Sequence, residues 1–100
     1  MAAEQVRSDF DQLKSIAGQF RSASETVNGM SQNLKGKLET LRGGDWVGKG
    51  ANKFYGEMDG SVMPSLKRLT NALNEANRIT NQIAQIMKQT EDETSALFRV

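Results

Sequence analysis

Apolar residues recur at alternating steps of three and four through both halves of this 100-residue chain. In the first half, one seven-residue series consists of Val6, Leu13, Phe20, Val27, Leu34 and Leu41, and its companion of Ala3, Phe10, Ala17, Ser24, Ser31 and Leu38. In the second half, the two series are Tyr55, Val62, Leu69, Ala76, Ile83 and Thr90, and Met58, Ser65, Ala72, Ile79 and Ile86. Because this spacing is typical of helices that pair with a left-handed twist, it predicts an all-α fold with two long helices.

The segment between the two halves is rich in glycine and breaks the helical pattern. Gly43 can adopt the left-handed conformation that closes a helix, and the carboxylate of Asp45 is suited to cap the next helix. Gly48 is expected to let the backbone approach the bulky indole of Trp46. The second helix should therefore begin within residues 46–50, and the chain should fold as an antiparallel helix-turn-helix hairpin.

The length of the chain fits a single domain. We expect residues 1–100 to form one helical hairpin. Its first helix should span about 3–42, the turn about 43–48, the second helix about 49–93 and a flexible tail 94–100.

The apolar stripes are wider than a lone hairpin needs. Ile16, Ala23 and Met30 flank the first stripe, and Leu66, Leu73 and Met87 flank the second. Monomeric soluble proteins rarely expose such strips, so we predict an obligate or near-obligate dimer in which two hairpins form a four-helix bundle. The expected core of the dimer and its bundle comprises Phe10, Leu13, Ala17, Phe20, Ser24, Val27, Leu34, Leu38, Leu41, Phe54, Met58, Val62, Leu66, Leu69, Leu73, Ala76, Ile79, Ile83 and Ile86. The helices should come closest at the small residues Ala17, Ser24 and Ser31.

The second helix carries one apparent defect. Gly56, Gly60 and Pro64 follow one another at four-residue intervals, and Pro64 lacks the amide that would bond the carbonyl of Gly60. A bend or local break near residues 60–64 is therefore predicted, either as a tolerated kink or as a groove where another segment docks. Asn71, Asn74, Asn77 and Asn81 are expected on a solvated outer face, away from the apolar stripe.

The composition argues against catalysis. The chain has no histidine and no cysteine, and the acidic pairs Asp9 with Asp11 and Glu91 with Glu93 lie two residues apart, on different faces of a helix. We predict no enzyme activity, no cofactor, no metal site and no small-molecule substrate. A net charge of +1 gives no attraction to nucleic acid. We also expect no signal peptide and no membrane span, so the protein should be made in the cytoplasm.

Charge is distributed unevenly along the predicted hairpin. Basic residues gather near the turn and acidic residues near the termini: Lys35, Lys37, Arg42, Lys49 and Lys53 against Glu4, Asp9, Asp11, Glu91, Asp92 and Glu93. Two antiparallel hairpins would place each basic turn beside the acidic termini of its partner. This complementarity favours a homodimer, and its contribution should lie in orientation and encounter more than in affinity.

Trp46-x-Gly48 lies at the centre of the chain between the two patterned helices, with Ala51 and Phe54 at the start of the second. With the length and the expected absence of a signal peptide, this arrangement resembles the WXG hundred-residue family, the ESAT-like substrates of type VII secretion, over almost the entire chain. The resemblance implies a hairpin that dimerises antiparallel, is exported folded without a cleaved signal peptide, and is recognised by a membrane-bound secretion ATPase. It makes Trp46 and Gly48 the turn and secretion-recognition residues.

One element of the family is absent from the expected place. Such proteins often carry Tyr-x-x-x-Asp/Glu beyond the second helix as part of an export signal, but the only tyrosine here is Tyr55, and the best positional match is Met87 with Glu91. Either a partner supplies this signal, or residues 87–93 serve as a degenerate form, or the protein is a companion that is not exported itself.

Three functions follow as hypotheses. The first is a secreted substrate or partner of a type VII secretion system, as a homodimer or as a heterodimer with another WXG-type protein. The second is a cytosolic adaptor that pairs with the helical leader of a larger secreted toxin. The third is a membrane-perturbing amphipathic effector, which the absence of histidine disfavours. Trp46 itself acts as a hydrophobic plug that closes the turn end of the bundle, or forms with Gly48 and a tail from the partner a composite surface that the secretion machinery recognises, or does both.

Overall fold

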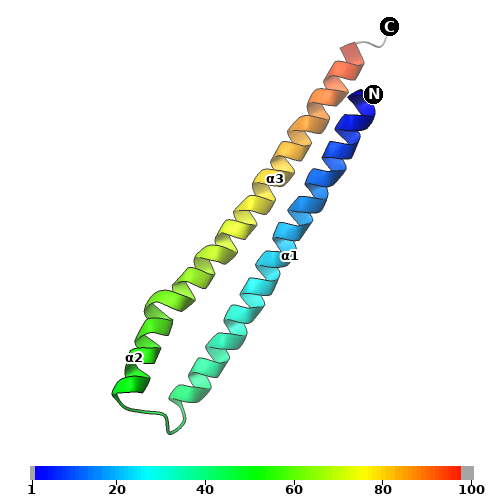
Figure 1. The fold of residues 1–100 in the computed structure, drawn as a ribbon. Coiled ribbons are helices and arrows are strands. Elements are labelled where there is room, and N and C mark those ends of the chain that lie inside the picture. Colours follow the sequence, from blue (N-terminus) through cyan, green and yellow to red (C-terminus); the bar gives the residue numbers. More distant parts are fainter. Residues whose placement is uncertain (1, 98–100) are drawn as a thin grey trace. The chain divides into compact units, whose positions relative to one another are not determined.

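The computed structural model describes residues 2–97, with side chains from Glu4 to Leu97. Its elements are α1 (Ala2–Arg42), α2 (Lys49–Glu57), a π-helix, η1 (Met58–Val62), and α3 (Met63–Leu97) (Figure 1). Within the described residues the all-α prediction is confirmed, and α2 begins inside the predicted window. The helix after the turn continues to Leu97, beyond the expected end near residue 93, whereas residues 98–100 of the predicted tail lie outside the described part.

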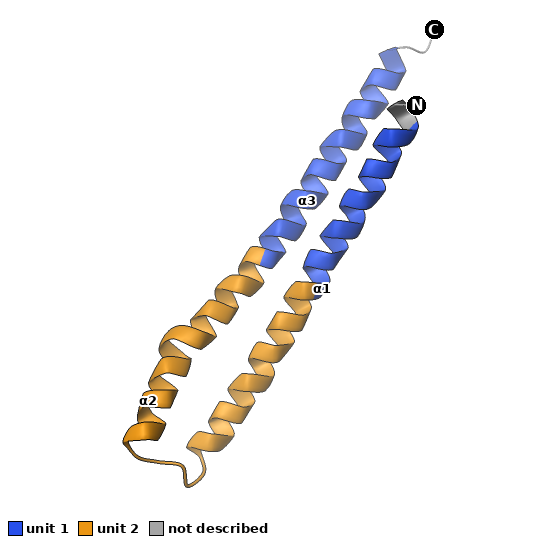
Figure 2. Cartoon of the chain, in the orientation of Figure 1, with its two compact units in different colours: residues 1–22, 73–100 blue, residues 23–72 orange. Residues whose placement is uncertain are grey.

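The chain divides into two compact units, which we call the terminal unit and the turn unit (Figure 2). The terminal unit comprises Met1–Ser22 and Leu73–Val100, and the turn unit comprises Ala23–Ala72. In the terminal unit, Phe10 contacts Lys88 and Lys14 contacts Asn81, so the segments of α1 and α3 run antiparallel there.

The inner face of α1 follows the predicted heptad series. In the terminal unit Ala17 is buried, with Leu13 and Phe20 half-buried on either side. In the turn unit Ser24 and Leu38 are buried. Small side chains allow helix backbones to come close, and the buried Ala17 and Ser24 occupy two of the three positions at which close approach was predicted.

The inner face of α3 differs from the expected one. In the terminal unit Ala84 is fully buried, whereas Ile79, Ile83 and Ile86 are 42%, 48% and 55% exposed. In the turn unit Met63 and Leu66 are half-buried. Val62 and Leu69, from the predicted series, are exposed. The helix therefore packs through positions one residue later than the strongest apolar repeat.

The asparagine-rich face is not simply a solvated surface, so that part of the sequence interpretation is wrong. The side-chain amide of Asn77 donates to the backbone carbonyl of Ala17 at 2.6 Å, and the ammonium group of Lys14 donates to the side-chain carbonyl of Asn81 at 2.8 Å. Asn71 and Asn74 are exposed. The reason is the shift of the inner face by one residue, which turns Asn77 and Asn81 toward α1.

The helical part after the turn, which consists of α2, η1 and α3, is called the second arm below. Its predicted irregularity is present as η1. The amide of Met63 donates to the carbonyl of Met58, five residues earlier, which is the bonding pattern of a π-helix. Pro64 follows directly and has no amide to donate. The ribbon changes direction at this point of the turn unit (Figure 1).

The turn closes differently from the predicted scheme. The amide of Gly43 donates to the carbonyl of Glu39 at 3.0 Å, and Gly43 does not have a positive φ. Among the described residues only Gly48 does, with φ of 116°, and it, rather than Asp45, precedes the first residue of α2. The predictions for Gly43 and Asp45 are wrong because the last turn of α1 continues into Gly43, and Gly48 takes both the positive φ and the position before α2.

Candidate functional site

Three aromatic rings cluster where the turn meets α2. The indole of Trp46 lies 5.3 Å from the ring of Phe54 and 5.5 Å from that of Tyr55, measured between ring centroids. Phe54 and Tyr55 are themselves 5.9 Å apart, and all three pairs are tilted or edge-to-face. These are the preferred geometries of aromatic pairs, each contributing about 0.5–1.5 kcal/mol beyond area burial. The cluster fixes the turn to the first helical segment after it.

Polar contacts hold the same cluster from α1 and η1. The guanidinium carbon of Arg42 lies 4.9 Å from the centroid of the Tyr55 ring, and Arg42 also forms an ion pair with Asp59. The hydrogen bond to the Asp59 carboxylate raises the pKa of Arg42 further above its already high value. The Tyr55 hydroxyl donates to the backbone carbonyl of Trp46 at 3.3 Å. Arg42 thus links the end of α1 to both Tyr55 and Asp59.

Gly48 is required by its backbone conformation. With φ of 116° and ψ of −176°, it occupies a region essentially restricted to glycine. Its carbonyl accepts the amide of Asn52 at 2.9 Å, which closes the first turn of α2. A Cβ built at this position meets no atom within 4 Å. The expectation that Gly48 makes room for the indole of Trp46 is therefore wrong.

The aromatic cluster remains largely open to solvent. Trp46 is 43% exposed and Val47 is 76% exposed, and with Leu41 and Phe54 they form an exposed apolar surface that we call the tip patch. An immobilised indole beside exposed aliphatic groups suits a binding surface, because its contacts are already ordered before a partner arrives. Trp46, Gly48 and Phe54 were recognisable from the sequence, which placed Tyr55 only in an apolar series and Arg42 only among the basic residues near the turn. The contact of Tyr55 with Trp46, nine residues before it, had no signal in the pattern beyond the presence of a second aromatic residue beside Phe54.

The degenerate export motif lies in the terminal unit. Met87 is half-buried on the inner face of α3. Glu91 lines an open groove of about 570 Å³, together with Val6, Phe10 and Lys88, and the Lys88 ammonium lies 5.7 Å from the centroid of the Phe10 ring. The structure therefore assigns Met87 to the packing between helices and leaves Glu91 accessible through the groove.

The predicted dimer and bundle core divides into three sets by burial in the single chain. Ala17, Ser24, Leu38 and Met58 are buried; Phe10, Leu13, Phe20, Val27, Leu34, Leu66, Leu73 and Ala76 are half-buried; Leu41, Phe54, Val62, Leu69, Ile79, Ile83 and Ile86 are exposed. The third set includes three isoleucines of the terminal unit, Ile79, Ile83 and Ile86, which we call the isoleucine face.

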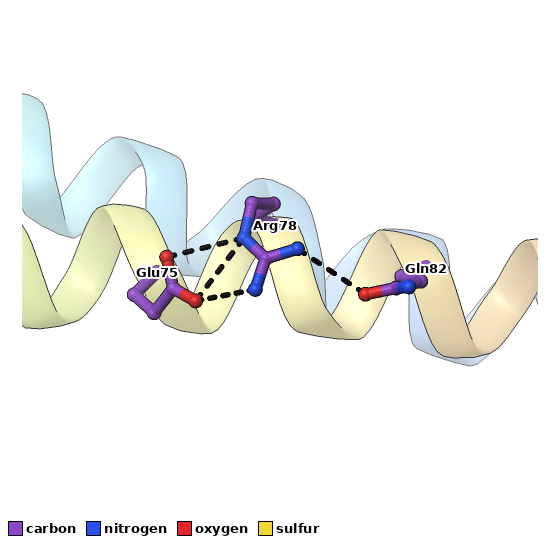
Figure 3. Close-up of polar contacts among 3 residues, drawn as sticks. All are labelled: Glu75, Arg78 and Gln82. Atoms are coloured by element: carbon purple, nitrogen blue, oxygen red, sulfur yellow. Dashed lines mark hydrogen bonds and ion pairs between the residues drawn. The ribbon is translucent and has the colours of Figure 1, made fainter.

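Three polar side chains on α3, those of Glu75, Arg78 and Gln82, bond to one another next to the isoleucine face, and we call them the polar ladder (Figure 3). Nε of Arg78 donates to both carboxylate oxygens of Glu75 at 3.1 Å, and Nη1 of Arg78 donates to the side-chain carbonyl of Gln82 at 3.2 Å. The Arg78 guanidinium holds the pKa of the Glu75 carboxyl below its usual range. These side chains are well exposed, so the ladder orders a strip of surface and adds little to stability.

Along residues 2–97, no group of three or more carboxylate, imidazole or thiol side chains is arranged to hold a metal ion. In the same part of the chain, no helix combines the length and the apolar character that crossing a bilayer demands.

Comparison with known proteins identifies the family. A family model described as proteins of 100 residues with WXG matches residues 5–92, which include Trp46 and Gly48 as well as most of both long helices. Searches among curated proteins and among solved structures returned no match. The chain, with its two long helices joined at an exposed Trp-x-Gly turn, belongs to the WXG100 family, small ESAT-like proteins associated with type VII secretion.

Proposed function

We propose that this chain pairs with a second copy of itself and is handled as a folded dimer by a type VII secretion system, whose ATPase recognises the tip patch. The observation that carries this proposal is that the Trp46 side chain is both held in place and exposed. Its indole is fixed by two ring contacts, yet 43% of its surface stays open. A side chain needed only to close the turn would gain from being buried, whereas a recognition residue has to remain accessible.

Self-pairing is supported by the apolar surface that the single chain leaves open. Both units expose large apolar side chains, among them Leu69 in the turn unit and Ile83 in the terminal unit. Burial of apolar surface contributes about 25 cal/mol per Å², so covering them with a partner is favourable. Members of the WXG100 family typically pair with other WXG proteins.

Charge supports a second copy in antiparallel orientation. The turn unit carries seven basic and five acidic residues, and the terminal unit carries six basic and seven acidic residues. An antiparallel pair places the more basic unit of each copy against the more acidic unit of the other. Exposed ion pairs contribute about 0–1 kcal/mol each, so the effect is to select an orientation.

The mass of the purified chain in solution tests the pairing. Size-exclusion chromatography with light scattering should give about twice the chain mass of 11.0 kDa. Raising the ionic strength should slow the association. A well-folded chain that keeps the mass of one copy at high concentration would contradict self-pairing.

Export tests the recognition role of Trp46. Trp46→Phe keeps an aromatic ring at the turn, so the dimer should persist while the amount of protein in the culture medium falls. Asn52→Ala is the matched control and should leave export unchanged, because the Asn52 side chain is exposed at the start of α2, beside the turn, and lies outside the tip patch. Unimpaired export of Trp46→Phe, with cell lysis excluded, would remove the recognition role.

The position of Met87 favours one second candidate, an adaptor that accompanies a larger secreted toxin. The family's tyrosine position is occupied here by a methionine that packs on the inner face of α3, so the chain presents no aromatic group there for export. An adaptor of this kind would copurify with the helical leader of the toxin and stay in the cell. Its accumulation in the medium of intact cells would favour the substrate role instead.

A further inference from the structure

The inner face of the second arm shifts by one residue within the turn unit. Ala51 and Met58 are buried and lie seven residues apart, as expected for one face of an α-helix. Continuing the same α-helical spacing from Met58 would bring Val62 and Leu69 to that face. Both are exposed instead, and Met63 and Leu66, each one residue after a position of the continued series, are half-buried.

The π-helix accounts for this shift. A π-helical turn contains one more residue than an α-helical turn, and one residue corresponds to a rotation of about 100° around the helix axis. The bond from the Met63 amide to the Met58 carbonyl marks the wider turn. Pro64 favours it, because in a regular α-helix its ring would press against the carbonyl of Gly60 and leave that carbonyl without a donor.

The terminal unit keeps the shifted face. Ala84 is fully buried and the isoleucine face is exposed, whereas the unshifted series would bury Ile83 in place of Ala84. Apolar burial alone would favour the isoleucines inside. Two polar contacts oppose that rotation: the bond from Asn77 to the carbonyl of Ala17 and the bond from Lys14 to Asn81.

We infer that η1 is the device that turns the isoleucine face away from α1 and makes it the surface that receives a second copy of this chain. The inference rests on the proposed self-pairing. Because of η1, the face of Asn77 and Asn81 is turned toward α1, and the isoleucine face is left open to the partner. The occupant is a second copy because its more basic turn unit complements the more acidic terminal unit that carries the face.

Replacing the residues that favour η1 tests the inference. The full-length variant Gly60→Ala with Pro64→Ala favours a continuous α-helix, in which the unshifted series faces α1. We expect loss of the dimer, seen as a fall from about twice 11.0 kDa to the mass of one chain. Deletion of Gly60 together with Pro64→Ala is the control: it removes the extra residue along with the wider turn, so Ala84 should still face α1 and the chain should remain dimeric.

A single cysteine reports which face of α3 lies inside, since the chain has none of its own. In the parent, the thiol of Ala84→Cys should resist alkylation whether or not the chain is paired, because residue 84 faces α1. In the full-length Gly60→Ala/Pro64→Ala variant that protection should be lost, and in the deletion variant it should be kept. Circular dichroism should show that both variants are helical.

The outcomes are distinct. A dimeric parent with an equally dimeric Gly60→Ala/Pro64→Ala variant and a protected thiol at position 84 in that variant would overturn the inference while leaving self-pairing intact. A parent that never pairs contradicts the proposed function itself. Should the full-length double variant not fold, Ile83→Glu in the parent decides: its dimer should be lost, Gln85→Glu should keep it, and a dimeric Ile83→Glu would refute the role of this face.

Discussion

The hydroxyl group of Tyr55 donates to the backbone carbonyl of Trp46 across 3.3 Å, so α2 anchors the turn through a side chain that the sequence pattern had placed in an apolar series. Tyr55→Phe removes this bond and keeps the ring. Because the site is partly exposed, we expect a loss of stability of about 0.5 kcal/mol, at the low end for a hydrogen bond. The single tryptophan should become easier to quench with acrylamide.

Tyr55→Leu is the companion variant. It also removes the ring contacts with Trp46, Phe54 and Arg42, so its loss of stability should exceed that of Tyr55→Phe by roughly 1 kcal/mol. Equal losses would mean that the rings contribute nothing to the turn.

Gly48→Ala should destabilise the protein through the backbone alone. Alanine is strained at φ of 116°, at a cost of about 1–3 kcal/mol. Gly36→Ala is the matched control: this glycine lies inside α1, a Cβ there meets no atom within 4 Å, and a gain of up to about 1 kcal/mol is expected. Urea denaturation of both variants should give shifts of opposite sign, and a neutral Gly48→Ala would contradict the backbone argument.

Ser31→Ala should stabilise the chain. The Ser31 hydroxyl is buried and has no hydrogen-bond partner among the described residues, and leaving such a group unsatisfied costs about 1–3 kcal/mol. The exposed Ser22→Ala measures the part due to helix propensity alone. Thermal unfolding should show a larger gain for Ser31→Ala than for Ser22→Ala. Equal gains would indicate that a water molecule satisfies Ser31.

Glu75 should contribute to the dependence of stability on pH. Its pKa is lowered from 4.5 by the hydrogen bond from Arg78, so the contact stabilises the folded state above about pH 4.5. That contribution is lost as the pH falls through the lowered pKa. The difference in melting temperature between the parent and Glu75→Gln should therefore be largest near neutral pH and shrink on acidification. A difference that grows in acid would reverse the sign and contradict the assignment.

The sequence predicted α1 more accurately than the second arm for a physical reason. In α1 the strongest apolar repeat is also the buried one, because nothing interrupts the helix between Ala2 and Arg42. In the second arm the strongest apolar repeat includes Ile79 and Ile83, so these residues were predicted to be buried. They are exposed because η1 contains one residue more than an α-helical turn, and the spacing of apolar residues does not reveal that extra residue. Pro64 did indicate where the regular α-helix is interrupted.

The functional site was likewise predicted in part. Trp46 and Gly48 were recognisable from their spacing, and the start of α2 followed from the glycines around them. The capping role of Asp45 was wrong, because Gly48 occupies the N-cap position of α2 and no side chain bonds to an amide there. The roles of Arg42 and Tyr55 depend on contacts across the turn, which no local pattern reports.

The short length of α2 determines which part of the protein unfolds first. Nine residues are fewer than the roughly 12–15 that an isolated helix needs to persist in water, and η1 interrupts its regular bonding to α3. This segment is held by the burial of Ala51, the edge-to-face ring contacts and the guanidinium of Arg42. On warming it should be the first region to exchange its amide hydrogens with deuterium, before either long helix loosens, so the end of the molecule that carries the tryptophan can melt and re-form while the rest stays folded.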